Sequence, residues 1–151
     1  MLVGRRDGQL TTDWEVGAEL FDSPHADKEV LECAQKLKRY FAGDRAAIDS
    51  IPTGAGTPFQ VAVWNACRAI PWGETRTYGW IAKRIRKSPV CCRAVGQALR
   101  RNPLSVIVPC HRVVGASGPG GYAGKTEGPM LRVKRTLLAL ESDDANLIHS
   151  R

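Results

Sequence analysis

The residue pair in the sequence that is best suited to catalysis is a cysteine followed directly by a histidine, Cys110 and His111. Basic neighbours favour the thiolate, which is the nucleophilic form of cysteine, so we expect a lowered pKa for Cys110. A nucleophilic role is one interpretation of this residue. The other is a buried structural cysteine that closes an apolar run, and the pair alone does not decide between them.

A carboxylate far along the chain supports the nucleophile interpretation. Glu141 follows Val133 and Leu137 at helical spacing, so it should point into the apolar interior. Buried carboxylates need a partner, and His111 would gain orientation from one. Glu141, His111 and Cys110 could then act as orienting carboxylate, base and nucleophile. The alternative is a frayed helix end that exposes Glu141 to water.

The basic side chains are concentrated in one segment of a chain whose net charge is +7. Residues 76–112 contain nine basic side chains and no acidic one, whereas residues 1–56 contain seven basic and ten acidic side chains. Such a field suits the phosphates of a nucleic acid, and a solvated basic surface is the alternative. Its members are Arg76, Lys83, Arg84, Arg86, Lys87, Arg93, Arg100, Arg101 and Arg112.

The N-terminal part of the chain predicts a small α+β lobe over residues 1–52. Apolar and polar residues alternate from position 13 to 20, which predicts a strand. Helical spacing predicts a helix from Pro24 to Phe41 that Gly43 ends, with an apolar face formed by Val30, Leu31, Ala34, Leu37 and Phe41. Residues 51–58 are rich in glycine and proline, so this segment is expected to be a linker.

Three helices are predicted after the linker. The first runs from about Pro58 to Ile70 with Thr57 as its N-cap, and its apolar face is formed by Phe59, Val63, Cys67 and Ile70. The second runs from about Thr77 to Ile85. The third runs from Val90 to Arg101 with Ser88 as its cap. The second and third helices have the outline of a helix-turn-helix, although many helical hairpins bind nothing.

The rest of the chain predicts an extended segment, a loop and a last helix. Residues 104–108 are an apolar run between prolines and should be buried extended chain that leads to the reactive cysteine. Five glycines between positions 115 and 124 predict a loop, and helical spacing predicts a helix from about Pro129 to Glu141. The fold class is therefore an α+β N-terminal lobe followed by a mainly helical C-terminal domain, residues 57–151, that contains a helix-turn-helix.

Composition excludes several classes of protein. The 151 residues are 43% hydrophobic and 25% charged, which is typical of a globular protein rather than a disordered one. No apolar run approaches the roughly 18 residues that span a bilayer, and the start has no signal-peptide core. The five cysteines include no CxxC pair, so we expect reduced thiols and no metal site. We expect the protein inside the cell, in the cytoplasm of a prokaryote or the nucleus of a eukaryote.

One block of residues is highly specific. Ile107-Val-Pro-Cys-His-Arg-Val-Val114, preceded by Arg93-Ala-Val-Gly96 and Asn102-Pro103, resembles the O6-alkylguanine-DNA alkyltransferases, also called methylated-DNA–protein-cysteine methyltransferases. The resemblance extends over about residues 57–141. It continues through Thr57-Pro-Phe-Gln-x-x-Val-Trp64, Ile70-Pro-Trp-Gly-Glu74, Tyr78, Gly121-Tyr122 and Leu137-Leu-Ala-Leu-Glu141.

The resemblance implies roles for the residues around the thiol. Cys110 would be the alkyl acceptor, and His111 would be a base that acts through a water. Glu141 would be the carboxylate behind the histidine, and Asn102 a polar brace near the thiol. The donor would be O6-alkylguanine, and also O4-alkylthymine, and the displacement would leave a thioether that thiols do not reverse. Each molecule would therefore act once, with no metal or organic cofactor.

The resemblance also implies a partner, double-stranded DNA that contains an alkylated guanine, with no membrane contact and with the protein as a monomer. A base inside a duplex cannot be reached, so it must be flipped out of the stack. Arg93 would replace the flipped nucleotide, and Tyr78 would help rotate its phosphate. Small residues at Ala94 and Gly96 would let the helix approach the groove. Phosphate contacts are expected from Arg100 and Arg101.

The base pocket would be lined by Tyr122 and by the main chain at Val113. Two features depart from the family pattern near this pocket and its helix. Residues 125–130 look longer than the usual short step, which bears on the shape of the pocket. Cys91 and Cys92 replace small residues just before the inserted arginine, which adds two thiols near the DNA.

Two rival functions remain to be weighed. An alkyltransferase-like protein would bind the lesion without reacting, and the cysteine at the acceptor position argues against it. A cysteine hydrolase would turn over repeatedly. Neighbouring side chains on extended chain point to opposite sides, so Cys110 and His111 could not form the direct pair that a hydrolase needs.

Overall fold

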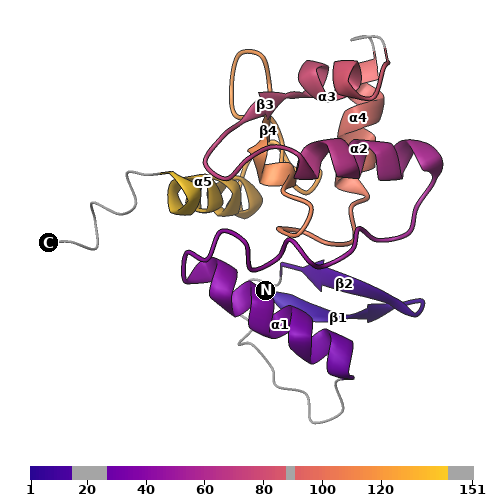
Figure 1. The fold of residues 1–151 in the computed structure, drawn as a ribbon. Coiled ribbons are helices and arrows are strands. Elements are labelled where there is room, and N and C mark those ends of the chain that lie inside the picture. Colours follow the sequence, from indigo (N-terminus) through magenta and orange to yellow (C-terminus); the bar gives the residue numbers. More distant parts are fainter. Residues whose placement is uncertain (15–26, 88–90, 143–151) are drawn as a thin grey trace, which may run out of the picture.

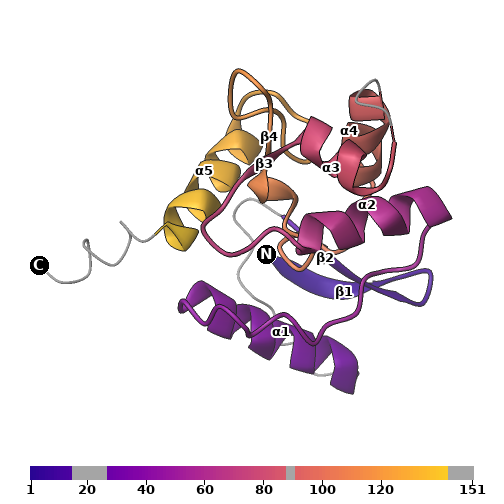
Figure 2. The same cartoon turned by 45° about the horizontal axis from the view of Figure 1, so that its top comes forward.

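The computed structural model describes residues 1–14, 27–87 and 91–142. The first elements are the strands β1 (Leu2–Arg6) and β2 (Gln9–Asp13) and the helix α1 (Lys28–Phe41). Figures 1 and 2 show these three elements together on one side of the molecule, with the later helices on the other.

β1 and β2 form an antiparallel hairpin that the sequence reasoning missed. Leu2 lies opposite Asp13, and the turn at Asp7 and Gly8 has φ values of 51° and 78°. An Asp-Gly pair in this conformation matches the right-handed twist of the two strands, which explains the tight turn. Most of the strand predicted over 13–20 lies outside the described residues.

Helix α1 confirms the predicted helix over residues 28–41, but it presents a different face to the core. Asp27 is its N-cap and accepts a hydrogen bond from the Val30 amide. The buried side chains are Cys33, Leu37 and Tyr40, at i, i+4 and i+7. Two residues of the predicted apolar face, Leu31 and Phe41, are exposed instead.

The helix α2 (Pro58–Arg68) confirms the predicted cap and the predicted face. The Thr57 side chain accepts from the Gln60 amide while the Gln60 side chain accepts from the Thr57 amide, which makes a capping box. Trp64 is buried and donates its Nε1 hydrogen to the Ala98 carbonyl at 2.9 Å. Ala98 lies on the helix α4 (Cys92–Arg100), so this bond joins α2 to α4.

Helices α3 (Tyr78–Arg84) and α4 (Cys92–Arg100) both pack against α2 and against each other. The second predicted helix is present, but Thr77 is its N-cap rather than its first residue and accepts a hydrogen bond from the Trp80 amide. Helix α4 follows Cys91, whose side chain makes no capping bond, and the predicted cap Ser88 lies outside the described residues.

Two short parallel strands, β3 (Arg76–Thr77) and β4 (Val113–Val114), join the start of α3 to the segment that follows Cys110. Residues 104–108 lead into that segment. The four apolar residues of this run are buried, as predicted, but the run is not extended. Val106 has a φ of 75°, and the Val108 amide bonds back to the Leu104 carbonyl at 2.9 Å, which makes a tight turn.

The last helix, α5 (Pro129–Glu141), has the bounds that its spacing predicts. Figure 1 shows it, in yellow, beside the turn that carries Cys110. Its buried face is formed by Lys134, Leu137 and Glu141. Within the described ranges, no helix is long and apolar enough to cross a membrane.

Candidate active site and nucleic-acid interface

Cys110 is the first residue of a 3₁₀ turn, Cys110–Arg112, between Pro109 and β4. The prediction of extended chain at this point is wrong, because the Arg112 amide bonds back to the Pro109 carbonyl at 2.9 Å. The thiol lies partly exposed in a pocket of about 190 Å³ whose walls include Tyr78 and Tyr122. The turn therefore presents one reactive group to a cavity with aromatic walls.

Asn102 braces this turn against the end of α4. Its Nδ2 donates to the Val108 carbonyl at 3.2 Å and lies 3.8 Å from the Cys110 sulfur, while its Oδ1 accepts from the Leu104 amide at 2.8 Å. One amide side chain thus fixes the segment on both sides of the tight turn and contacts the thiol. The structure places Asn102 where a brace is expected.

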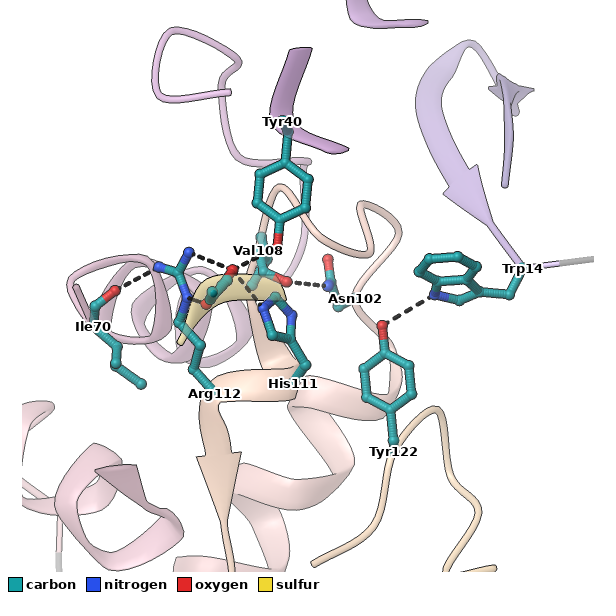
Figure 3. A network of polar contacts seen from close by, with 9 residues as sticks. Trp14, Tyr40, Ile70, Asn102, Val108, His111, Arg112 and Tyr122 are labelled. Atoms are coloured by element: carbon teal, nitrogen blue, oxygen red, sulfur yellow. Dashed lines mark hydrogen bonds and ion pairs between the residues drawn. The ribbon is translucent and has the colours of Figure 1, made fainter. Parts of the chain in front are cut away.

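Glu141 and His111 are both buried and directly bonded. Figure 3 shows His111, Arg112 and Tyr40 within this network of polar contacts. The His111 Nε2 lies 2.8 Å from Glu141 Oε1. Three further bonds reach the same carboxylate, two from Arg112 at 2.7 and 2.8 Å and one from the Tyr40 hydroxyl. The prediction that Glu141 is buried is confirmed. The same contacts remove Arg112 from the predicted surface field, since it is buried here.

These contacts set the charges of the pair. Burial alone would raise the pKa of Glu141, but hydrogen bonds from His111 and Arg112 outweigh it and lower the pKa to about 2. Burial lowers the pKa of His111, so the imidazole is neutral at physiological pH. An ionised carboxylate can only accept, so Nε2 carries the imidazole proton and Nδ1 keeps a free lone pair.

The resting thiol differs from the sequence expectation. Burial raises the pKa of Cys110 above its usual value, and this effect exceeds the lowering by Asn102, by the Lys134 charge and by Tyr122. The prediction of a thiol activated by its cationic neighbours is therefore wrong for the resting state. A base must remove the proton during the reaction, and the Nδ1 lone pair of His111 is chemically suited to do so.

Lys134 is a site residue that the sequence reasoning missed. Its side chain is 0% exposed, and its Nζ lies 2.6 Å from the Val113 carbonyl, 2.5 Å from that of Pro119 and 3.1 Å from that of Gly121. Burial lowers its pKa to about 8, so the ammonium still carries three hydrogens at neutral pH. Lys134 therefore fastens the loop that forms one wall of the pocket.

The aromatic walls of the pocket depend on glycines. A Cβ at Gly120 would lie 3.2 Å from the Tyr78 hydroxyl, and one at Gly96 would lie 3.8 Å from the Tyr78 ring. The tyrosine thus occupies a slot between α4 and the loop over 115–124. Tyr122 is 3% exposed and lines the same pocket. Val113, predicted to meet the base, is buried on β4, and its carbonyl bonds to Lys134.

Part of the segment over residues 125–130, which the sequence analysis expects to be longer than is usual in the family, lines the same pocket. Tyr122 and Lys125 exchange two backbone hydrogen bonds, at 2.8 and 2.9 Å, which close a tight turn over Ala123 and Gly124. Lys125 and Thr126 then line the cavity. The prediction that residues 125–130 bear on the shape of the pocket is consistent with this placement.

The exposed face of α4 carries the predicted DNA-contacting residues. Arg93, Ala94, Arg100 and Arg101 are exposed, and Gly96 is half-buried, whereas the opposite face packs into the core. A basic, small-residue face on a helix suits close approach to a groove. Two of these residues, Gly96 and Arg100, also line the pocket that contains Cys110.

Arg100 has a more specific position than the sequence predicted. A Cβ at Gly124 would lie 2.5 Å from its Nε, so the guanidinium rests directly on the loop. Arg100 also lines the pocket that contains Cys110. It therefore borders the entrance of the pocket, while Arg101 stays on the outer surface. Among the described residues, no cluster of three or more potential metal ligands is present.

Comparisons with known proteins show the family of the chain. The family described as 6-O-methylguanine DNA methyltransferase, DNA binding domain, matches residues 58–143. A methylated-DNA–protein-cysteine methyltransferase of Methanosarcina acetivorans is 42% identical over 93% of this chain and 90% of its own. The constitutive Bacillus subtilis protein of that name is 48% identical over 85% of this chain and 75% of its own.

Solved structures give the same result. The R37L variant of the Mycobacterium tuberculosis O6-methylguanine methyltransferase superposes with a TM-score of 0.63 at 37% identity, over 89% of this chain and 81% of its own. The M. tuberculosis protein in complex with DNA gives 0.60 at 40% identity, over 79% and 73%. The chain therefore belongs to the 6-O-methylguanine DNA methyltransferase family, the methylated-DNA–protein-cysteine methyltransferases.

Proposed function

We propose that this protein repairs DNA directly, by moving the alkyl group of O6-alkylguanine onto Cys110. The observation that carries the proposal is the position of the thiol. Cys110 lines a pocket together with Tyr78 and Tyr122. The next residue of the same turn is the buried His111, which is bonded to Glu141. Family membership supplies the reaction class, and the geometry supports these residues as the ones that perform it.

In the proposed mechanism His111 accepts the thiol proton through a water, using the Nδ1 lone pair. Glu141 holds the imidazole in the required tautomer and stabilises the imidazolium that forms. The thiolate then attacks the alkyl carbon in line with the departing guanine oxygen. A sulfur–carbon bond forms as the carbon–oxygen bond breaks, and the guanine takes up a proton. Because the thioether persists, the protein acts once.

Access to the base requires flipping, which we assign to α3 and α4 acting as a helix-turn-helix within a domain over residues 57–151. Arg93 would fill the space that the flipped nucleotide leaves, and Tyr78 would guide its phosphate toward the pocket. Extrusion costs a few kcal/mol, least for a poorly paired lesion, so the damaged base is favoured. The N-terminal lobe over residues 1–52 would support the pocket from behind, in a protein that binds duplex DNA as a monomer.

The test is the intact mass of the protein after incubation with a duplex that contains O6-methylguanine. We expect the mass of one methyl group, on the peptide that carries Cys110, and no gain in a Cys110→Ala control. Product beyond one equivalent of protein would indicate a turning-over enzyme. Label on Cys67, Cys91 or Cys92 instead would overturn the assignment, and binding without any mass change would indicate an alkyltransferase-like protein.

A second prediction separates base flipping from phosphate binding. Arg93→Ala should slow transfer from duplex DNA at least about tenfold while changing transfer from the free base O6-benzylguanine little, because the free base needs no flipping. Arg101→Ala should weaken binding to every duplex and reduce the slope of log affinity against log salt by about one. Rates on both substrates and binding at several salt concentrations check this. An equal loss on duplex and free base in Arg93→Ala would contradict it.

A further inference from the structure

We propose that Trp14, at the end of β2, is a positioning residue for the reaction at Cys110, and that it acts through Tyr122. The indole Nε1 donates a hydrogen bond to the Tyr122 hydroxyl at 3.0 Å, as Figure 3 shows. The inference rests on the proposed function, because it assigns to the N-terminal hairpin a part in the chemistry of that pocket.

The position of Trp14 is fixed by the strand that leads to it. Thr12, two residues earlier, is buried and bonds through its amide to the Pro103 carbonyl at 2.9 Å and through its hydroxyl to the Ser105 carbonyl at 2.8 Å. Side chains two apart on a strand share a face, so Thr12 and Trp14 both face the C-terminal domain. The hairpin is therefore fastened to the segment just after Asn102, and Trp14 reaches the pocket from a fixed base.

The bond determines the direction of the tyrosine proton. An indole nitrogen can only donate, so the Tyr122 oxygen must accept from Trp14, and its own hydrogen is free to point elsewhere. Tyr122 and Cys110 line the same pocket, and the Tyr122 hydroxyl lowers the pKa of Cys110, although burial has the larger effect and raises it. Through Tyr122, Trp14 therefore fixes one wall of the pocket that contains the thiol.

A purely structural role is the competing explanation, because the Trp14 ring also packs edge-on against Phe41 at 6.3 Å between centroids. Packing would make the indole matter for stability whether or not Tyr122 carries a hydroxyl. A positioning role predicts that the nitrogen of Trp14 matters only while the hydroxyl of Tyr122 is present. The two explanations are therefore separated by a double-mutant cycle.

The experiment uses Trp14→Phe, Tyr122→Phe and the double variant, each of which keeps an aromatic ring. Alkyl transfer from free O6-benzylguanine is measured against pH. Trp14→Phe should slow transfer about fivefold at neutral pH, the size expected of one hydrogen bond, and shift the rise of the pH–rate profile to higher pH. In the Tyr122→Phe background the same change should have no further effect. An equal slowing in both backgrounds would overturn the proposal.

Trp80→Phe is the matched control, because Trp80 is also partly buried and lies on α3 between Arg76 and Arg84 rather than against Tyr122. It should leave the rate with the free base near wild type. The same cycle is also run on urea unfolding, which does not depend on activity. Coupling in unfolding without coupling in rate would overturn the positioning role. A wild-type protein that gains no alkyl group would instead refute the proposed function, while the unfolding cycle still reports on the contact.

Discussion

Replacing Glu141 by glutamine should slow alkyl transfer by at least about 100-fold, the lower range for loss of a general base. Four hydrogen-bond donors converge on this carboxylate, from Tyr40, His111 and Arg112. Glutamine offers one oxygen and places an NH₂ group against at least one of those donors. The imidazole then loses both its orientation and the charge that stabilises its protonated form.

The same change should lower the stability of the protein, because it leaves the buried Arg112 charge without its anion. Breaking one side of a buried pair costs about 3–5 kcal/mol. Urea unfolding at neutral pH measures this loss. Transfer rates must therefore be compared without urea, at a temperature at which Glu141→Gln is fully folded. A folded Glu141→Gln protein with the wild-type rate would falsify the proposed role of the carboxylate.

The free energy of unfolding of the wild-type protein should also depend on Glu141 at acid pH. The pKa of Glu141 is about 2 in the folded state, against an ordinary value of 4.5. A depressed folded pKa stabilises the protein above pH 4.5, and this contribution of roughly 3 kcal/mol is lost as the pH falls toward about 2. Glu141→Gln should lack this part of the acid dependence. Tyr40→Phe, which removes a single donor, should keep it.

The sequence predicted those parts of the site that depend on local signals. The Thr57 cap and the spacing from Pro129 to Glu141 placed α2 and α5 correctly, because capping and helical period act within a few residues. The burial of Glu141 followed from the same period. The apolar run before Cys110 was also read correctly as buried, since its hydrophobicity does not depend on its backbone conformation.

The remainder depended on contacts between distant parts of the chain. Arg112 looked like one more member of the basic field, and only the fold shows that it is buried against Glu141. Val106 takes a left-handed conformation that a β-branched residue adopts rarely, so no local rule indicated the turn. The raised pKa of Cys110 comes from desolvation, which cannot be predicted from the residues adjacent to it in the sequence.

Lys134 could have been found, because it precedes Leu137 by three residues and Glu141 by seven, on the same face of α5. A lysine in the buried stripe of a helix requires acceptors, and the glycine-rich loop is the part of the chain with spare carbonyls. The row predicted to be buried begins at Val133, one residue earlier, so it did not include Lys134. The structure shows why the position tolerates a charge, since three carbonyl oxygens accept hydrogen bonds from the ammonium.

Replacing Lys134 by methionine should damage stability and reactivity together. Methionine fills much of the volume but leaves the buried Val113 carbonyl and the partly exposed carbonyls of Pro119 and Gly121 without their shared donor. Unsatisfied buried groups cost about 1–3 kcal/mol each, with some relief if the loop moves and water enters, so we expect a loss of about 3 kcal/mol. Thermal melting and urea unfolding measure it.

The reactivity loss has two physical sources that one measurement can separate. The positive charge of Lys134 lowers the pKa of Cys110, so Lys134→Met should shift the pH–rate profile to higher pH. Loosening of the loop should instead lower the rate at every pH, because Tyr122 and the pocket wall lose their fixed position. Arg135→Met is the control, since Arg135 is the next residue of α5 and is exposed. If Lys134→Met unfolds and reacts like Arg135→Met, the buried ammonium neither fastens the loop nor assists the thiolate.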